Sequence, residues 1–173
     1  MIYSISQISD IINAQLIGKH NCEINTILID SRNIISSPNT LFFAIRGQRH
    51  DGHQFIEELY NRGIQNFVVE FLPDNHFSFP KANFLIVKNS LEALQKLAAS
   101  HRNKFKYPVV GVTGSNGKTI VKEWIYHVLQ GKKQIIRNPK SYNSQVGVPL
   151  SVCLMDDIYD FAIFEAGISL PGE

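Results

Sequence analysis

The chain alternates short apolar runs with polar stretches that contain glycine, proline or asparagine. The runs are rich in valine, isoleucine and phenylalanine, which is typical of buried β-strands. Between them, apolar residues recur every three or four positions, as they do along one face of a helix. The expected strands are 27–29, 41–45, 67–69, 84–87, 109–112, 134–137 and 159–165, and the expected helices include 54–61, 91–98 and 120–129. Strands that alternate with helices predict an α/β fold.

The beginning of the chain adds a short strand and a helix. Ile8, Ile11 and Ile12 recur at helical spacing, and the Ser6 hydroxyl is expected to cap the start of that helix. Residues 27–29 and 41–45 lie so close in sequence that they predict neighbouring strands of a small sheet. We place a domain boundary after residue 88, which gives the two expected domains 1–88 and 89–173.

Composition narrows the class of protein. A chain of 173 residues with 44% apolar residues can fold around a packed core. A net charge of +2 and scattered basic residues argue against nucleic-acid binding. No run approaches the roughly 18 apolar residues of a membrane-spanning helix. The start lacks a signal-peptide pattern, and the spacing of Cys22 and Cys153 is not that of metal ligands, so we expect a cytoplasmic protein with buried thiols.

The segment 109–119 carries the strongest functional signal. An apolar run breaks into glycines and ends in Gly-Lys-Thr, and helical spacing follows. A loop of this kind curls its backbone N–H groups around a phosphate at the positive end of a helix. Gly114 and Gly117 permit the curl because they lack a Cβ, and Asn116 tolerates a left-handed backbone. The predicted nucleotide-binding residues are Gly114, Ser115, Asn116, Gly117, Lys118 and Thr119.

Lys118 and Thr119 have the side chains that triphosphate chemistry requires. Lys118 would reach the β- and γ-phosphates of ATP, and the Thr119 hydroxyl would bind Mg²⁺. The usual pattern has a glycine where this chain has Val112, so a glycine-rich turn without function is the alternative. We favour the phosphate-binding loop because strand, loop and helix follow one another in the order that the chemistry needs.

Glu165 is a candidate for two roles. With Lys118 it is a predicted catalytic residue, and with Thr119 it is a predicted metal ligand. It ends the apolar strand 159–165, and parallel sheets place active groups at the carboxyl ends of their strands. A carboxylate beside a phosphate-binding loop can coordinate Mg²⁺ directly or through water. The alternative is a glutamate exposed to solvent at the end of a strand.

Two polar segments are candidates for substrate binding. Residues 46–53 bring arginines, histidines and glycines together between a strand and a helix, although Asp51 could merely cap that helix in a solvated connection. Residues 138–150 are rich in asparagine and serine and follow the triphosphate loop, although a surface loop is the simpler interpretation.

These motifs resemble those of the Mur ligases, which build the peptide of bacterial cell-wall precursors. The resemblance rests on 113–119 followed by Lys122-Glu123, on 30–32 with 41–44, on Gly47 with 51–55, and on Asn143 with 147–150. Val112 in place of glycine is the family's own form of the loop. The resemblance runs along the whole chain.

The resemblance implies two domains with different ligands. Residues 1–88 are similar to the small mixed α/β domain that holds the UDP-sugar substrate. Residues 89–173 are similar to the first part of the central ATPase domain, which carries the phosphate-binding loop on a mostly parallel sheet and uses ATP and Mg²⁺. The substrate-binding residues that it implies are Ser31, Arg32, Gly47, Asp51, His53 and Asn143.

Within the family, the residues look most like those of the member that joins D-alanyl-D-alanine to UDP-N-acetylmuramoyl-tripeptide. That reaction passes through an acyl phosphate and forms ADP, in peptidoglycan precursor synthesis. A sister ligase that adds one amino acid to UDP-N-acetylmuramoyl-dipeptide stays open, as does a switch-like ATPase that binds a protein partner. A purely structural loop is the third alternative.

The last residues, Leu170-Pro171-Gly172-Glu173, carry no cap or polar tail, so we expect a truncated chain. The resemblance implies that family members carry, beyond this point, a histidine, a carbamylated lysine that helps bind a second metal ion and a C-terminal domain for the amine substrate. It therefore implies that this chain binds substrates without ligating them. Residues 138–145 and 164–169 also resemble a subgroup of these ligases that is fused to a downstream alanine racemase.

Overall fold

The computed structural model describes residues 2–18, 21–32, 37–47, 50–139 and 142–168. The chain divides into two compact units, Met1–Lys96 and Leu97–Glu173, and the division falls inside helix α3 (Ser90–Arg102). The predicted domain boundary after residue 88 stays a prediction. Residues 169–173, on which the expectation of a truncated chain depends, lie outside the described residues, as do parts of the predicted substrate segments at 48–49 and 140–141.

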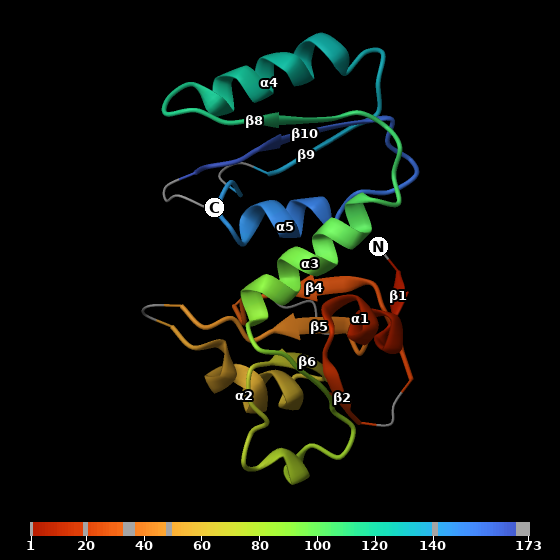
Figure 1. Cartoon of the computed structure of the whole chain (residues 1–173), viewed down its shortest axis with the longest axis vertical. Coiled ribbons are helices and arrows are strands. Elements are labelled where there is room, and N and C mark those ends of the chain that lie inside the picture. The colour runs from red at the N-terminus through yellow and green to blue at the C-terminus, as the bar shows by residue number, and fades with distance from the viewer. Residues whose placement is uncertain (1, 19–20, 33–36, 48–49, 140–141, 169–173) are drawn as a thin grey trace. The chain divides into compact units, whose positions relative to one another are not determined.

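The first unit contains a five-stranded sheet with the order β2-β7-β6-β5-β4 (Figure 1). Its strands are β2 (Gln15–Ile17), β4 (Thr26–Leu28), β5 (Thr40–Phe43), β6 (Asn66–Val69) and β7 (Asn83–Ile86). β2 pairs with β7 in antiparallel fashion, and the remaining pairs are parallel. A separate antiparallel pair joins β1 (Tyr3–Ser4) to β3 (Glu23–Ile24). The expected small sheet, with 27–29 beside 41–45, is therefore confirmed.

The helical segments of the first unit are short. They are α1 (Ile5–Ile12), η1 (Gly52–Phe55), α2 (Ile56–Asn61) and η2 (His76–Ser78). The prediction that Ser6 caps α1 is wrong, because the helix already begins at Ile5. Ser4 caps it instead: its hydroxyl accepts from the Gln7 N–H at 3.2 Å, and the Gln7 side chain accepts from the Ser4 N–H at 2.9 Å. This reciprocal pair is a capping box.

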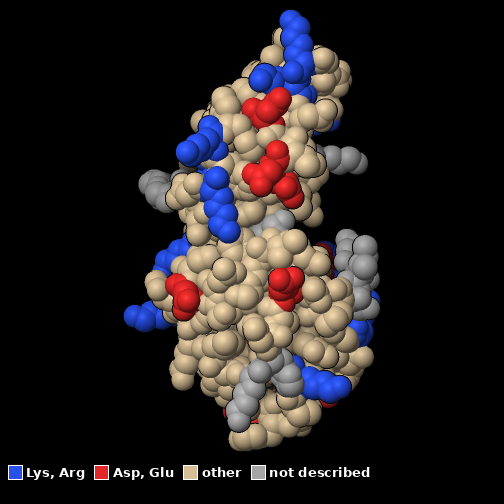
Figure 2. Space-filling view, turned by 90° about the vertical axis from the view of Figure 1, so that its right-hand side faces the viewer, with Lys and Arg blue, Asp and Glu red and all other residues tan. Residues whose placement is uncertain are grey.

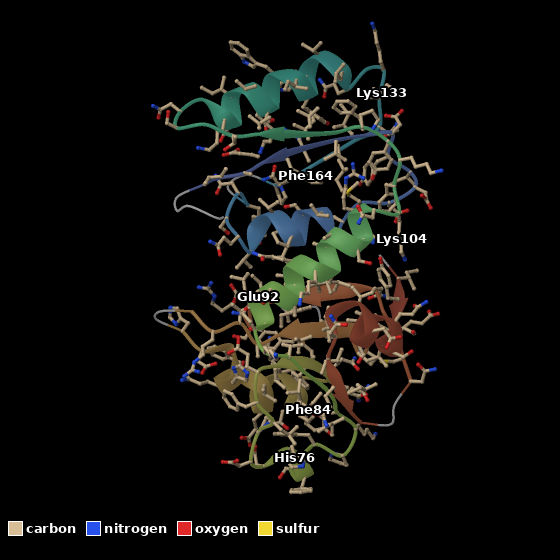
Figure 3. All side chains as sticks on the ribbon, viewed as in Figure 1. His76, Phe84, Glu92, Lys104, Lys133 and Phe164 are labelled. Carbon is tan, nitrogen blue, oxygen red and sulfur yellow. The ribbon has the colours of Figure 1, made fainter. Side chains whose placement is uncertain are left out.

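Aromatic rings on adjacent strands form the centre of the first core. The register places Phe42 opposite Phe67 and Phe67 opposite Phe84, so the three side chains share one face of the sheet. The rings of Phe67 and Phe84 stack with centroids 5.6 Å apart, and Figure 3 shows Phe84 among the side chains beneath the sheet. Ile56 and Leu59 of α2 pack into the same cluster. Leu41 and Phe43, which alternate with Phe42, are equally buried, so both faces of the sheet are covered.

The second unit is built on a three-stranded parallel sheet with the order β8-β10-β9. Its elements are β8 (Val109–Val112), α4 (Lys118–Leu129), β9 (Ile135–Arg137), α5 (Gly147–Val152) and β10 (Phe161–Glu165). Figure 1 shows α4 on one face of this sheet and α5 on the other. Phe164 lies between the sheet and α5 in Figure 3, within a core that includes Ile136, Met155 and Ala162. The predicted α/β class is confirmed in both units.

The surface carries no extended field of one charge on the face that Figure 2 shows, where basic and acidic side chains are scattered among uncharged ones. Within the described residues, no helix is long and apolar enough to cross a membrane. The apolar residues predicted for the helix after the loop do lie on α4, but several of them face outward: Ile120, Val121, Trp124 and Val128 are exposed.

Candidate active site

The loop between β8 and α4 has the conformation that its glycines predicted. Gly114 has φ +139° and Gly117 has φ +78°, both in the region that side chains with a Cβ rarely adopt. Gly117 is the residue directly before α4 and has a left-handed backbone. A strand, an exposed loop and a helix N-terminus therefore follow one another, and the unpaired N–H groups at that terminus favour an anion.

Lys118 lies along this loop. Its ammonium group donates a hydrogen bond to the carbonyl oxygen of Gly114, at 2.7 Å. The side chain thus folds back over the turn formed by the two glycines. A phosphate that bound the loop N–H groups would offer this cation a stronger, charged acceptor than the carbonyl.

Glu165 is buried at the carboxyl end of β10, the central strand of the sheet, and is only 2% exposed. Its two carboxylate oxygens are held by different segments. The Thr119 hydroxyl donates to Oε2 at 2.9 Å, and the Asn143 amide donates to Oε1 at 2.9 Å. The structure therefore brings Thr119 and Glu165 together, and the alternative of a solvent-exposed glutamate is excluded.

The surroundings of Glu165 favour its ionised form. Burial is the largest single effect and acts to raise its pKa. Hydrogen bonds from Asn143 and Thr119, together with the positive charge of Lys122, outweigh burial and lower the pKa of Glu165 below its ordinary value. The site thus holds a buried carboxylate anion directly beside the start of α4.

Lys122 and Asn138 belong to the same cluster, although the prediction of site residues omitted both. Lys122 has no exposed surface, and its Nζ lies 3.6 Å from Glu165 Oε2 and 3.2 Å from the Asn138 carbonyl oxygen. The Asn138 side chain exchanges two hydrogen bonds of 2.9 Å with the Glu165 backbone. One signal in the sequence could have found Lys122: it follows Lys118 by four residues, which places both on one face of α4.

Asn143, predicted as a substrate contact, lies in the cluster around Glu165. Its carbonyl oxygen accepts from the Gly167 N–H at 2.7 Å, so this segment is also tied to the chain that follows β10. A Cβ on Gly147 would lie 2.7 Å from the Tyr142 backbone, so this close approach requires glycine. The proposed role of Asn143 in substrate binding stays a prediction.

In the first unit, Asp51 and His53 form a compact pair. Asp51 Oδ1 accepts from the His53 N–H at 2.9 Å, as an N-cap of η1, and lies 2.6 Å from His53 Nδ1. Burial acts to raise the pKa of Asp51, but the hydrogen bonds from His53 and the positive charge of Arg46 outweigh burial and lower that pKa overall. Asp51 thus does cap the following helix, as the alternative interpretation of this loop had it, and the same carboxylate also positions a histidine. The proposed role of Asp51 in substrate binding stays a prediction.

His53 is fixed at both ring nitrogens. Its Nε2 accepts from the Glu70 N–H at 2.9 Å, which requires the proton to sit on Nδ1, facing Asp51. The ring also stacks on Phe71 with centroids 4.2 Å apart. Gly47 stands at the start of the same loop, where its N–H donates to the His50 carbonyl at 2.8 Å. These contacts fix the position of the His53 ring in the segment that follows β5.

Ser31 and Arg32 form a second group. Arg32 binds both oxygens of Asp30, at 2.6 and 2.9 Å, and these hydrogen bonds lower the pKa of Asp30 to about 2. The Ser31 carbonyl accepts from the Arg62 side chain at 3.1 Å. Within the described residues, no hydrogen bond or ion pair joins this group to Gly47, Asp51 or His53.

Comparison with known proteins accounts for both groups of motifs. The family model described as "Mur ligase family, catalytic domain" matches residues 23–102, and the model "Mur ligase middle domain" matches residues 112–173. The chain belongs to the Mur ligase family.

Two curated relatives of this chain carry the same name. The UDP-N-acetylmuramoyl-tripeptide–D-alanyl-D-alanine ligase of Haemophilus influenzae is 33% identical over 98% of this chain, and that of Synechocystis is 37% identical over 87% of it. Crystal structure I of MurF from Acinetobacter baumannii matches the full chain with a TM-score of 0.88 at 27% identity. The match covers 37% of that structure's own length. MurF ligase from Thermotoga maritima, in complex with ADP, matches 86% of the chain and 33% of its own length, with a TM-score of 0.73 at 31% identity. The chain spans 37% and 32% of the lengths of the two curated relatives.

Proposed function

We propose that this chain supplies the UDP-sugar-binding domain and the phosphate-binding part of an ADP-forming Mur ligase. The reaction would join D-alanyl-D-alanine to UDP-N-acetylmuramoyl-tripeptide in peptidoglycan precursor synthesis. The names of the curated relatives support this substrate pair. The ADP complex of the Thermotoga maritima relative supports the nucleotide.

One observation in the structure carries the proposal: the hydrogen bond between Thr119 and Glu165. It joins the first turn of α4 to the end of the neighbouring parallel strand, β10. A hydroxyl and a carboxylate meeting beside a phosphate-binding loop form the usual Mg²⁺ position of nucleotide-hydrolysing sites. A structural loop would not need a buried carboxylate at this point.

The donor atoms at this position fit Mg²⁺. The ion binds oxygen ligands at about 2.0–2.1 Å in octahedral geometry, which puts adjacent ligands about 2.9 Å apart. Thr119 Oγ1 and Glu165 Oε2 are separated by 2.9 Å. No group of three or more His, Cys, Asp or Glu in the described part of the chain is placed to hold a metal ion. Magnesium that accompanies a nucleotide needs only one or two protein ligands, because phosphates and waters complete its shell.

The loop glycines and Lys118 then have separate tasks in transfer of the γ-phosphoryl group to the tripeptide carboxylate. The N–H groups around Gly114 and Gly117 bind phosphate oxygens. Lys118 leaves the Gly114 carbonyl and stabilises negative charge that develops on the β,γ-bridging oxygen, which is an electrostatic task. Bound Mg²⁺ supplies further positive charge to the phosphate oxygens. The amine of D-alanyl-D-alanine then attacks the acyl phosphate, giving the amide and releasing phosphate.

The nucleotide part of the proposal is tested by thermal unfolding with MgATP. We expect stabilisation of about 2.7 kcal/mol at a hundredfold excess over the dissociation constant, because the ligand binds only the folded chain. Lys118→Ala should largely abolish the shift. Lys132→Ala removes the same charge just beyond the other end of α4 and should leave the shift intact. Equal stabilisation of parent and Lys118→Ala would contradict the phosphate-binding assignment.

The substrate part is tested by calorimetric titration of the full chain. UDP-N-acetylmuramoyl-tripeptide should bind more tightly than the dipeptide form, and UDP alone should bind most weakly. A preference for the dipeptide form would instead support the sister ligase. Absence of binding by all three, from folded protein that still binds MgATP, would support the switch-like ATPase.

A further inference from the structure

Lys122 is a fully buried lysine in the middle of the nucleotide site, and nothing in the proposed chemistry has yet used it. It lies one helical turn after Lys118 on α4. Burying an ammonium group is unfavourable unless it is paired and hydrogen-bonded. Its neighbours therefore indicate why this position holds a lysine.

The neighbours of the Lys122 ammonium group include three oxygen atoms of described residues. They are the Asn138 carbonyl oxygen at 3.2 Å, Glu165 Oε2 at 3.6 Å and Glu123 Oε1 at 3.7 Å. Glu123 already has a closer cation, because Arg137 forms an ion pair with it and also lies over the Tyr126 ring at 3.7 Å. Lys122 is thus the cation that balances the buried Glu165.

The position of Lys122 also links separate elements. It belongs to α4, whereas Asn138 follows β9 and Glu165 ends β10. Asn138 is itself locked to the Glu165 backbone by two hydrogen bonds. On the carboxylate, Asn143 holds Oε1, while Thr119 and Lys122 both face Oε2. Among the described residues, removal of Lys122 would leave Oε2 with the neutral Thr119 hydroxyl as its partner.

We propose that Lys122 is a positioning residue: its ammonium group fixes the Glu165 carboxylate beside the Thr119 hydroxyl, so that the two can share the Mg²⁺ of a bound nucleotide. The inference rests on the proposed nucleotide site. A simple charge argument predicts the opposite effect, because a nearby cation repels Mg²⁺. The sign of the change when Lys122 is neutralised therefore decides between positioning and repulsion.

The test compares ATP affinity in excess Mg²⁺ with ATP affinity in EDTA, for the full chain and for Lys122→Met. Methionine keeps much of the length of the side chain without its charge. Residues that orient a metal ligand typically contribute about 10–100-fold in metal affinity. For Lys122→Met, we expect the ratio of the ATP affinity in Mg²⁺ to the ATP affinity in EDTA to fall by about tenfold or more. The affinity in EDTA should stay nearly unchanged.

The matched control is Lys132→Met, which makes the same substitution at an exposed lysine just beyond the other end of α4. Its affinity ratio should equal that of the parent. Electron paramagnetic resonance of Mn²⁺ in place of Mg²⁺ gives a second readout. Lys122→Met should change the spectrum of the nucleotide-bound ion, and Lys132→Met should not.

A double-mutant cycle keeps the test decisive if Lys122→Met folds poorly. In a Glu165→Gln background no buried carboxylate is left unpaired, so the added Lys122→Met change should be tolerated better. If Lys122 acts through Glu165, it should have no further effect on the affinity ratio in that background.

The outcomes separate this inference from the proposed function. A parent chain that does not bind MgATP contradicts the nucleotide site itself. A parent with Mg²⁺-dependent binding and a Lys122→Met ratio that is equal or higher overturns the positioning role alone. Equal losses with Mg²⁺ and with EDTA also overturn it, because they indicate a general structural effect.

Discussion

Buried ionisable side chains in the second unit are accommodated in two different ways. Lys122 keeps charged partners around it, as described above. His101 instead contacts two neutral groups: its Nε2 is 2.9 Å from the Met155 carbonyl oxygen, and its ring meets Phe105 edge-on at 5.1 Å. Burial lowers the pKa of His101, and Lys104 acts in the same direction, whereas the Met155 carbonyl and Asp156 oppose the shift. The folded chain therefore favours neutral His101.

This preference predicts a loss of stability in mild acid. The unfolded chain binds a proton near the ordinary pKa of 6.5, but the folded chain resists it until a lower pH. The contribution of neutral His101 to stability is therefore fully present above pH 6.5. The free energy of unfolding should fall as the pH drops below that value. The free energy of unfolding can be measured with urea at several pH values. Its slope against pH between about pH 5 and 7 should be smaller for His101→Gln than for the parent.

His127 supplies the matched control for that measurement. It is exposed on α4, and His127→Gln makes the same substitution outside the buried site. Glutamine at position 101 can still donate to the Met155 carbonyl, so the comparison removes the titration rather than the hydrogen bond. A slope that is the same in the parent and in His101→Gln would show that other groups cause the acid sensitivity.

At the scale of elements, the apolar pattern of the sequence predicted most strands, because a strand that is buried on both faces is a continuous apolar run. The run Leu41–Phe43 has no exposed residue, and such continuous apolar runs are visible in sequence. β2 was missed because three residues, Gln15–Ile17, become a strand only by pairing with β7. α5 was missed because Gly147 and Pro149 are typical of loops. Pro149 is tolerated in the first turn, where its missing N–H would have no partner within the helix.

The candidate site was predictable where a residue belongs to a contiguous motif or ends a recognisable strand. Gly117, Lys118 and Thr119 form one motif, and Glu165 ends a recognisable strand. Lys122 and Asn138 gain their roles from the strand order β8-β10-β9, which sets the end of β9 beside that of β10. Pairings between distant strands leave no local pattern. Helical spacing likewise identified α4 but did not show which of its faces is covered. Trp124 is 67% exposed and faces outward.

At the scale of the whole molecule, each unit has its own core. Phe42, Phe67 and Phe84 lie in one cluster, and Ile136 and Phe164 lie in the other. Compact units with separate cores commonly open as separate cooperative units. The proposed nucleotide residues all belong to Leu97–Glu173, so a nucleotide should stabilise that unit in particular.

Native-state hydrogen exchange can measure this difference. At a hundredfold excess of MgATP over its dissociation constant, amides of β8, β10 and α4 that exchange through opening of the second unit should gain about 2.7 kcal/mol of protection. Amides of β5, β6 and β7 should gain little, because the first unit can open without releasing the nucleotide. Lys118→Ala should remove the gain. Helix α3 crosses the division between the units, so its amides are left out of the comparison. An equal gain in both sheets would contradict separate opening, since it would mean that the chain unfolds as one cooperative unit.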